Sequence, residues 1–181
     1  DAEDKATGRT RYAGDYTMPG MLHGRVLRSE LASGRLKHLD ASGARTLPGV
    51  FCVLTAEELP DRLAATDMPG QTGQKRSATD RQILVREFIR HHGEPLALIA
   101  AQTPAIAEKA LDLIEYEIEP LPGVYDIESA LAPDAPIVTE PDNIVGQYNI
   151  RKGDVEMGFA EADHIIENTF NTQFIEHAFL E

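Results

Sequence analysis

Six histidines and one cysteine are the side chains in this sequence that could hold a transition metal. The histidines are His23, His38, His91, His92, His164 and His177. A zinc site takes its ligands from an i, i+4 pair on a helix or from a Cys/His cluster, and only His91 and His92 are close in sequence. Neighbours on a strand point to opposite faces, so this pair cannot chelate one ion. The sequence therefore predicts no metal site.

Glu176 and His177 place a carboxylate beside an imidazole, two groups that general acid–base catalysis uses. On a strand these neighbours face opposite ways and cannot form a dyad with each other. We expect one of them to anchor the strand against a neighbouring domain, and no catalytic residue is assigned.

Two shorter polar groups allow a binding or a structural interpretation. Arg25, Arg28 and Ser29 could receive an anion, but no second loop of backbone donors completes such a site, which favours a solvated strand face. The turn from His92 to Pro95 could recognise a ligand, but Gly93 and Pro95 also suit a tight entry into a buried strand. Neither group is assigned a catalytic role.

The single cysteine, Cys52, excludes an intrachain disulfide and any multi-thiolate metal site. It lies in the apolar run from Val50 to Leu54, which predicts a strand, and a small thiol there is expected to be buried.

These groups must be positioned by short strands and helices. Strands are predicted at 22–28 and 35–39, with Ser33-Gly34 as the turn from one to the other. A short helix at 41–46 leads through Pro48-Gly49 to the strand at 50–54, and Thr55 with Glu58 forms a capping-box pattern.

The clearest unit lies between residues 96 and 119. The continuous apolar run 96–101 is typical of a strand covered on both faces. Thr103 and Pro104 begin a helix that extends to Ile114, and 114–119 alternates as a half-exposed strand. This β-α-β unit has no Gly-rich phosphate loop, which excludes a Rossmann nucleotide site.

The remaining segments are less regular. Residues 64–81 form a long polar loop, 127–131 and 155–162 are short helices, 143–150 is strand-like, and 164–179 is a strand pair or one bent strand. A single α+β domain with a mixed sheet and a possible C-terminal arm accounts for the whole pattern.

Composition limits the classes of partner. The 181 residues are 42% hydrophobic and 26% charged, which matches one ordinary globular domain, and the net charge of −13 argues against nucleic acid. Since no apolar run could cross a bilayer and the N-terminus is unlike a signal peptide, we expect a cytoplasmic location. The chain ends in mid-strand at Phe179-Leu180-Glu181 and begins without methionine, which predicts a piece of a longer polypeptide.

Five strings in register carry a family resemblance. They are D-A-E-D-K-A-T-G-R-T-R-Y-A-G-D from Asp1 with P-G-M-L-H-G-R-V-L-R-S from Pro19, L-P-G-V-F-C-V-L-T-A-E-E-L-P from Leu47, the stretch from H-G-E-P at His92 to E-P-L-P at Glu119, K-G-D-V-E-M-G-F-A-E-A-D from Lys152, and E-H-A-F-L-E from Glu176. Together they resemble the large subunit of the xanthine dehydrogenase/aldehyde oxidase family of molybdenum hydroxylases.

The resemblance implies an α/β-hammerhead domain over residues 1–150, followed at 151–181 by the start of the connection into a molybdopterin-binding domain. The family's cofactor loops and catalytic glutamate lie beyond the E-H-x-x-L-E strand, so no cofactor site is expected in this chain. Glu176 and His177 are the nearest residues to that site by resemblance. The family often has glutamine where this sequence has Ile175.

The expected function is therefore that of a scaffold within a molybdopterin-dependent hydroxylase that acts on an aldehyde or an N-heterocycle. The resemblance implies partners that carry iron–sulfur clusters and FAD, on other domains or subunits, and an isolated chain without activity that could self-associate through its C-terminal segment. The substrate is not determined by these residues. The alternative is a free-standing, non-catalytic module that binds a small ligand or a protein.

Overall fold

The computed structural model describes residues 2–59, 82–139, 142–144, 149–173 and 175. Two compact units are distinguished: residues 19–147 form one, and residues 1–18 with 148–181 form the other. The predicted loop at 64–81 lies entirely outside the described residues.

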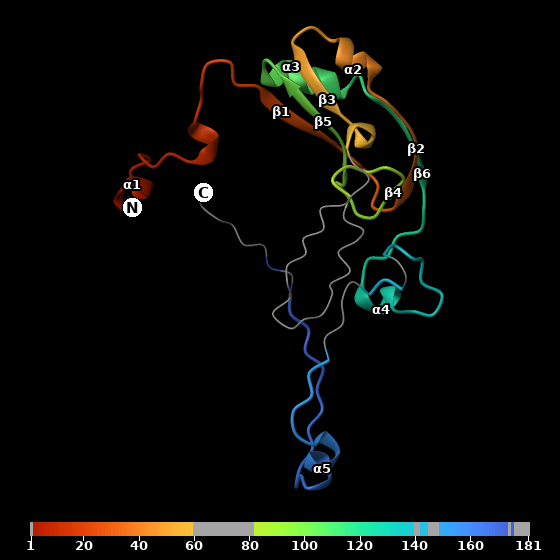
Figure 1. Ribbon diagram of the computed structural model, residues 1–181. Coiled ribbons are helices and arrows are strands. Elements are labelled where there is room, and N and C mark those ends of the chain that lie inside the picture. Colours follow the sequence, from red (N-terminus) through yellow and green to blue (C-terminus); the bar gives the residue numbers. More distant parts are fainter. Residues whose placement is uncertain (1, 60–81, 140–141, 145–148, 174, 176–181) are drawn as a thin grey trace. The chain divides into compact units, whose positions relative to one another are not determined.

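Two three-stranded sheets lie in the described part of the larger unit (Figure 1). Sheet A has the order β1-β5-β3, and sheet B has the order β4-β2-β6. The strands are β1 (His23–Arg28), β2 (Gly34–Asp40), β3 (Val50–Leu54), β4 (Phe88–Ile89), β5 (Pro95–Ala101) and β6 (Glu115–Pro120). The α+β prediction is confirmed, but every strand pairing among the described residues is antiparallel rather than mixed.

Short helices lie between these strands or follow the last of them. In the larger unit they are α2 (Ser42–Thr46), the 3-10 helix η2 (Ala56–Glu58), α3 (Pro104–Leu111) and α4 (Ile127–Ala130). The predicted starts are confirmed at α3, where the Thr103 side chain accepts from Ile106 N and Pro104 occupies the first turn, and at η2, which has a complete capping box.

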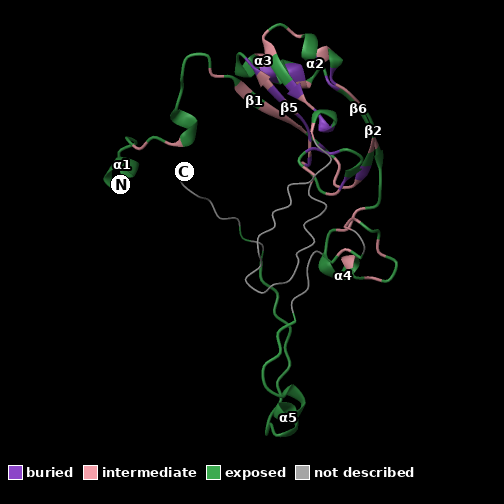
Figure 2. Cartoon of the chain, viewed as in Figure 1, coloured by how far each residue is buried: buried purple, intermediate pink, exposed green. Residues whose placement is uncertain are grey.

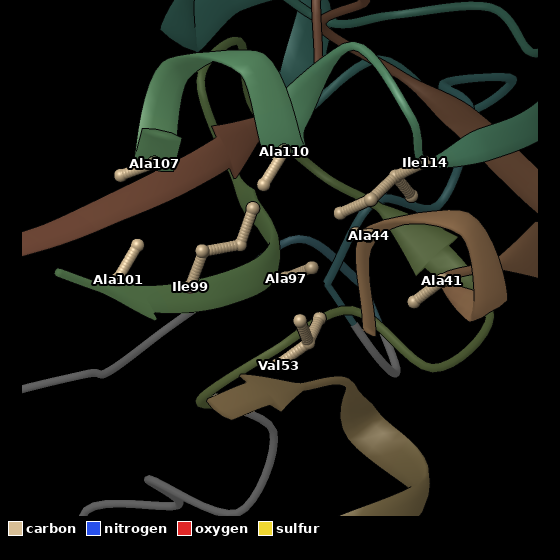
Figure 3. Close-up of a cluster of buried hydrophobic side chains, with 9 residues drawn as sticks. All are labelled: Ala41, Ala44, Val53, Ala97, Ile99, Ala101, Ala107, Ala110 and Ile114. Carbon is tan, nitrogen blue, oxygen red and sulfur yellow. The ribbon is translucent and has the colours of Figure 1, made fainter. Parts of the chain in front are cut away.

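The main hydrophobic core lies between sheet A and the helices α2 and α3 (Figure 3). Ile99 and Val53 come from the sheet, and small residues such as Ala107 and Ala110 allow α3 to approach closely. One face of α3 is buried in this core, with Ala107 and Ala110 at 0% exposure. A second cluster of Val85, Ile89 and Leu96 packs beneath sheet B.

Two predicted connections are wrong. Strands 22–28 and 35–39 do not form a hairpin, because β1 pairs with β5 in sheet A while β2 pairs with β4 and β6 in sheet B. For the same reason β5 and β6 are not the parallel pair of a β-α-β unit: α3 carries the chain from one sheet to the other. The local sequence pattern indicates where strands and helices form, whereas contacts between distant parts of the chain determine which strands pair.

The smaller unit contains α1 (Ala2–Ala6), the 3-10 helix η1 (Ala13–Asp15) and α5 (Val155–Ala160). Asp154 caps α5, since its side chain accepts from Met157 N at 3.0 Å. Residues 164–173 and 175 contain no strand, so the strand predicted at 164–179 is not found in its described part. Residues 143, 144, 149 and 150 are not strand either.

Large apolar residues of the smaller unit, such as Phe159 and Phe170, are exposed. Figure 2 shows α5 in the colour of exposed residues. Within the described ranges, residues 164–173 are exposed and pair with no strand, so they lack the buried face and the hydrogen-bonding neighbour that a strand requires. Among the helices in the described ranges, none combines the length and the apolar composition that crossing a bilayer would need.

Candidate functional site

The turn before β5 is a closed structural corner. Ser29 and Glu94 are 2% and 6% exposed. Ser29 N donates to Glu94 O and Gly93 N donates to Ser29 O, each at 2.9 Å, while a carboxylate oxygen of Glu94 accepts from Arg90 N at 2.6 Å. Gly93 has φ +81°, a conformation that suits glycine. These backbone donors are engaged within the protein, as the interpretation of a tight strand entry requires.

The arginines beside this corner have structural partners. Arg25 Nε lies 2.5 Å from a carboxylate oxygen of Glu108 on α3. Arg28 Nη1 donates to Gly93 O at 2.8 Å. Ser29 Oγ donates to Leu31 O at 2.9 Å and accepts from Leu31 N at 3.1 Å. The three residues tie β1 to its neighbours and do not converge on a common anion position.

The histidines in the described ranges do not gather. His91 Nδ1 lies 3.0 Å from the carbonyl oxygen of His92. Within the described part of the chain, no group of three or more His, Cys, Asp or Glu residues could hold a metal ion. Glu176 and His177 lie outside the described residues.

The prediction of a buried Cys52 is wrong, because its side chain is exposed. The register of β3 shifts between Val50 and Cys52, so Phe51 is an extra residue relative to β5. Such a bulge disrupts the in–out alternation of a strand, and β3 is also an edge strand of sheet A. Phe51 and Cys52 are consequently both exposed.

Among the described residues, four carboxyl groups have a lowered pKa, each with a local cause. Hydrogen bonds from the Thr55 hydroxyl and then the Thr55 backbone N–H lower the pKa of Glu58, and Arg45 also contacts this carboxylate. The others are Asp40, whose pKa is lowered first by Ser42 N–H, Glu119, lowered by Lys37, and Asp126, lowered by Ser129. All four shifts favour the ionised form, which suits caps and ion pairs rather than a general acid.

Described residues line hollows in both units. An open cleft of about 280 Å³ lies in the larger unit over Leu96 and Val85, with Lys37, Glu57 and Arg86 among its lining residues. A wider groove of about 430 Å³ runs between α5 and residues 164–166. Its walls include Val155, Phe159 and Ile165, which are more than half exposed.

One ordering residue was not predicted from the sequence. Asn143 has φ +64°, and its side-chain oxygen accepts from Val138 N at 2.7 Å and Thr139 N at 3.0 Å. Its side-chain nitrogen donates to Pro136 O at 2.9 Å and Ala130 O at 3.2 Å. The sequence signal was an asparagine close to prolines, because asparagine tolerates the left-handed region and bonds locally to backbone.

The arrangement of antiparallel sheets, buried corner and short helices matches a known family. The family model described as the a/b hammerhead domain of aldehyde oxidase and xanthine dehydrogenase matches residues 7–122. The chain belongs to this family.

Relatives of this hammerhead chain align along its whole length. It is 37% identical over 183 residues to the xanthine dehydrogenase molybdenum-binding subunit of Escherichia coli O157:H7, covering 100% of this chain and 24% of that protein. It is 34% identical over 181 residues to the nicotinate dehydrogenase large molybdopterin subunit of Eubacterium barkeri, covering 100% of this chain and 40% of that protein. The hammerhead chain thus spans between about a quarter and two fifths of these two relatives.

Solved structures confirm the predicted hammerhead fold. The aldehyde oxidoreductase from Desulfovibrio gigas aligns with a TM-score of 0.72 and 28% identity, covering 90% of this chain and 18% of that one. Quinoline 2-oxidoreductase from Pseudomonas putida 86 aligns with a TM-score of 0.62 and 38% identity, covering 74% and 17%.

Proposed function

We propose that this hammerhead chain is the scaffold portion of a molybdopterin-dependent hydroxylase of the xanthine dehydrogenase/aldehyde oxidase type. The observation that carries the proposal is the full-length match to a molybdenum-binding subunit, of which the chain covers 24%. In this proposal residues 1–150 are the hammerhead domain and 151–181 begin the connection to a molybdopterin-binding domain.

The chain's own contribution is to position and pack rather than to react. Several of its ionised groups are engaged in caps and ion pairs, as at Glu58 with Thr55 and at Arg25 with Glu108. The backbone donors at the buried corner are bonded to Ser29 and Glu94, so that corner does not fit the phosphate group of a molybdopterin. We derive no chemical step through the cofactor from these residues.

Other parts of the protein would supply the chemistry. The proposed parent enzyme hydroxylates an aldehyde or an N-heterocycle with water as the oxygen source, and it passes electrons to iron–sulfur and FAD domains or subunits. Glu176 and His177 are proposed to anchor the chain near the cofactor domain. We also propose a cytoplasmic location, since a chain with one cysteine has no intrachain disulfide of the kind common in secreted proteins.

The experiment that tests this proposal is a hydroxylation assay on the complete natural polypeptide with its co-expressed subunits. Aldehydes and N-heterocycles are supplied with an electron-accepting dye in isotopically labelled water. We expect dye reduction and incorporation of the labelled oxygen into product, and neither with the 181-residue chain alone. Absence of labelled product from the complete, molybdenum-loaded protein would instead favour the non-catalytic binding module.

A further inference from the structure

The two sheets of the larger unit differ in the polarity of the face that lies away from the core. Across β2 and β6 of sheet B, three cross-strand pairs consist of ionisable residues. They are Arg35 with Glu119, His38 with Glu117, and Asp40 with Glu115. Lys37 Nζ also lies 2.7 Å from a Glu119 carboxylate oxygen. Charged pairs of this kind are expected on the solvated face of an antiparallel sheet.

Sheet A does not follow this rule. Its Ile99 face packs against α3 and α2, as Figure 3 shows for Ile99, Ala107 and Ala44. Two cross-strand rows occupy the opposite face, which we call the bare face. The rows are Gly24, Ala100 and Cys52, and Val26, Leu98 and Leu54. None of the six residues carries a charge, and all six are half-buried or exposed.

The strand in the middle of sheet A has the sequence of a strand covered on both sides. From Leu96 to Ala101 it carries no polar residue, a pattern typical of two-sided burial. Leu96 is fully buried by the second cluster, with Val85 and Ile89. Further along the same face, Leu98 and Ala100 remain half-buried. The described residues therefore cover one end of this face and leave the rest apolar and partly accessible.

We propose that the bare face docks a helix or strand with large apolar side chains from elsewhere in the same natural polypeptide. This rests on the proposed function, in which the hammerhead is one part of a longer chain. The row Gly24, Ala100 and Cys52 is made of small residues, so a bulky apolar group can approach the backbone closely. The matched relatives have most of their length outside the region that this chain covers.

We expect the docked segment to come from the same polypeptide, because tethering raises its effective concentration at the bare face. Docking of a second copy of the chain is opposed by electrostatic repulsion. Two copies would each bring a net charge of −13, whereas the bare face has no charged group to offset their repulsion. A tethered apolar segment docks without that cost.

Cys52 reports directly on this face. It is the single cysteine of the chain and is exposed. N-ethylmaleimide is added to the 181-residue chain and, separately, to the complete natural polypeptide, and labelling of the Cys52 peptide is followed by mass spectrometry. We expect labelling about tenfold slower or more in the complete polypeptide. Equal rates would overturn the proposal, and slow, concentration-dependent labelling of the 181-residue chain would assign the face to a second copy instead.

Gly24→Glu provides a matched perturbation. A Cβ at Gly24 would meet no heavy atom closer than Ile99 O at 3.9 Å, so the added carboxylate leaves the isolated chain folded while it charges the bare face. The control, Ala105→Glu, adds the same charge at an exposed position in the first turn of α3, where an acidic residue is tolerated. In the complete polypeptide, Gly24→Glu should restore fast Cys52 labelling and Ala105→Glu should not; slow labelling in both variants would contradict docking on this face.

Failure of this inference can be separated from failure of the proposed function. If the complete polypeptide contains molybdenum and is active but Cys52 is labelled rapidly, the docking proposal is refuted and the proposed function stands. If the complete polypeptide has no hydroxylase activity but Cys52 is protected, the proposed function is refuted and the docking proposal stands.

Discussion

Arg25 Nε on β1 lies 2.5 Å from a carboxylate oxygen of Glu108 on α3, and this ion pair joins the edge of sheet A to the helix that covers it. Both side chains remain substantially exposed, at 39% and 58%. Exposed ion pairs contribute about 0–1 kcal/mol because water and salt screen them. Glu108→Gln should therefore lower the free energy of unfolding by less than about 1 kcal/mol.

The measurement is urea denaturation of the wild type and of Glu108→Gln at low and high salt, with Glu128→Gln, at an exposed position of α4, as the control. The difference for Glu108 should shrink as salt increases. A loss that is large and independent of salt would contradict the assignment of a screened surface pair.

In the core between sheet A and α3, truncating a fully buried side chain should destabilise the protein more than truncating a partly buried one. Ile99 is 3% exposed and belongs to the main core cluster, so Ile99→Ala should cost about 2–5 kcal/mol. Leu111 is only partly buried against the same cluster, so Leu111→Ala should cost about 2 kcal/mol, near the lower limit. Denaturation midpoints measure both, and a larger loss at Leu111 than at Ile99 would refute the packing described here.

Gly49 precedes β3 in a conformation that excludes most side chains. Its φ is +90°, and a Cβ built there would lie 2.7 Å from Ile106 Cδ1. Gly49→Ala should therefore destabilise the protein by more than about 1 kcal/mol. Gly14→Ala is the control, because a Cβ at Gly14 meets nothing within 4 Å. Thermal melts of the two variants that coincide would contradict the prediction.

Glu58 should make stability depend on pH in the acid range. Its pKa is lowered in the folded state, first by the Thr55 hydroxyl and then by the Thr55 backbone N–H. Stability from the ionised carboxylate is therefore present above the ordinary pKa of 4.5 and is lost as pH falls through the lower folded value. Subtracting the unfolding free energy of Glu58→Gln from that of the wild type isolates this contribution, and a difference that grows as pH falls would have the wrong sign.

Asn143 should order the segment that precedes it. Asn143→Gly keeps access to φ +64° but removes the four side-chain hydrogen bonds to residues 130–139. Amide exchange at Val138 and Thr139 should become faster, while exchange at Leu98 in β5 stays unchanged. Unchanged exchange at Val138 and Thr139 would show that the side-chain bonds do not hold this segment.

The exposed apolar residues of the smaller unit lead to a prediction about association. Ile166 and Phe170 are 84% and 85% exposed, so the isolated 181-residue chain should self-associate weakly through residues 164–180. Because the net charge of −13 opposes association, salt should strengthen it. Sedimentation at two salt concentrations measures this; a Phe170→Ser variant that associates as strongly as the wild type would exclude this segment.

Local sequence signals predicted where the helices and strands of the hammerhead lie, but they did not predict which strands pair. Thr103-Pro104 and the Thr55 capping box fix helix starts through contacts within a few residues, so the sequence alone predicts them. The pairing of β1 with β5 depends on residues about 70 positions apart, and the turn at Ser33-Gly34 gave no information about it.

The exposure of Cys52 also depends on non-local structure, so the local sequence did not predict it. The run from Val50 to Leu54 reads as a buried strand, but burial also depends on the bulge at Phe51 and on the edge position of β3. The family resemblance, by contrast, was readable from motifs spread along the chain, and the match over residues 7–122 confirms it. The roles proposed for Glu176 and His177 stay predictions.

The most direct test of the scaffold assignment is molybdenum analysis by mass spectrometry. The 181-residue chain and the complete natural polypeptide are each co-expressed with the machinery for cofactor synthesis and insertion, then purified. We predict molybdenum bound in a fixed ratio to the complete polypeptide and none retained by the 181-residue chain. Stoichiometric molybdenum in the 181-residue chain, or none in the complete polypeptide, would contradict the account.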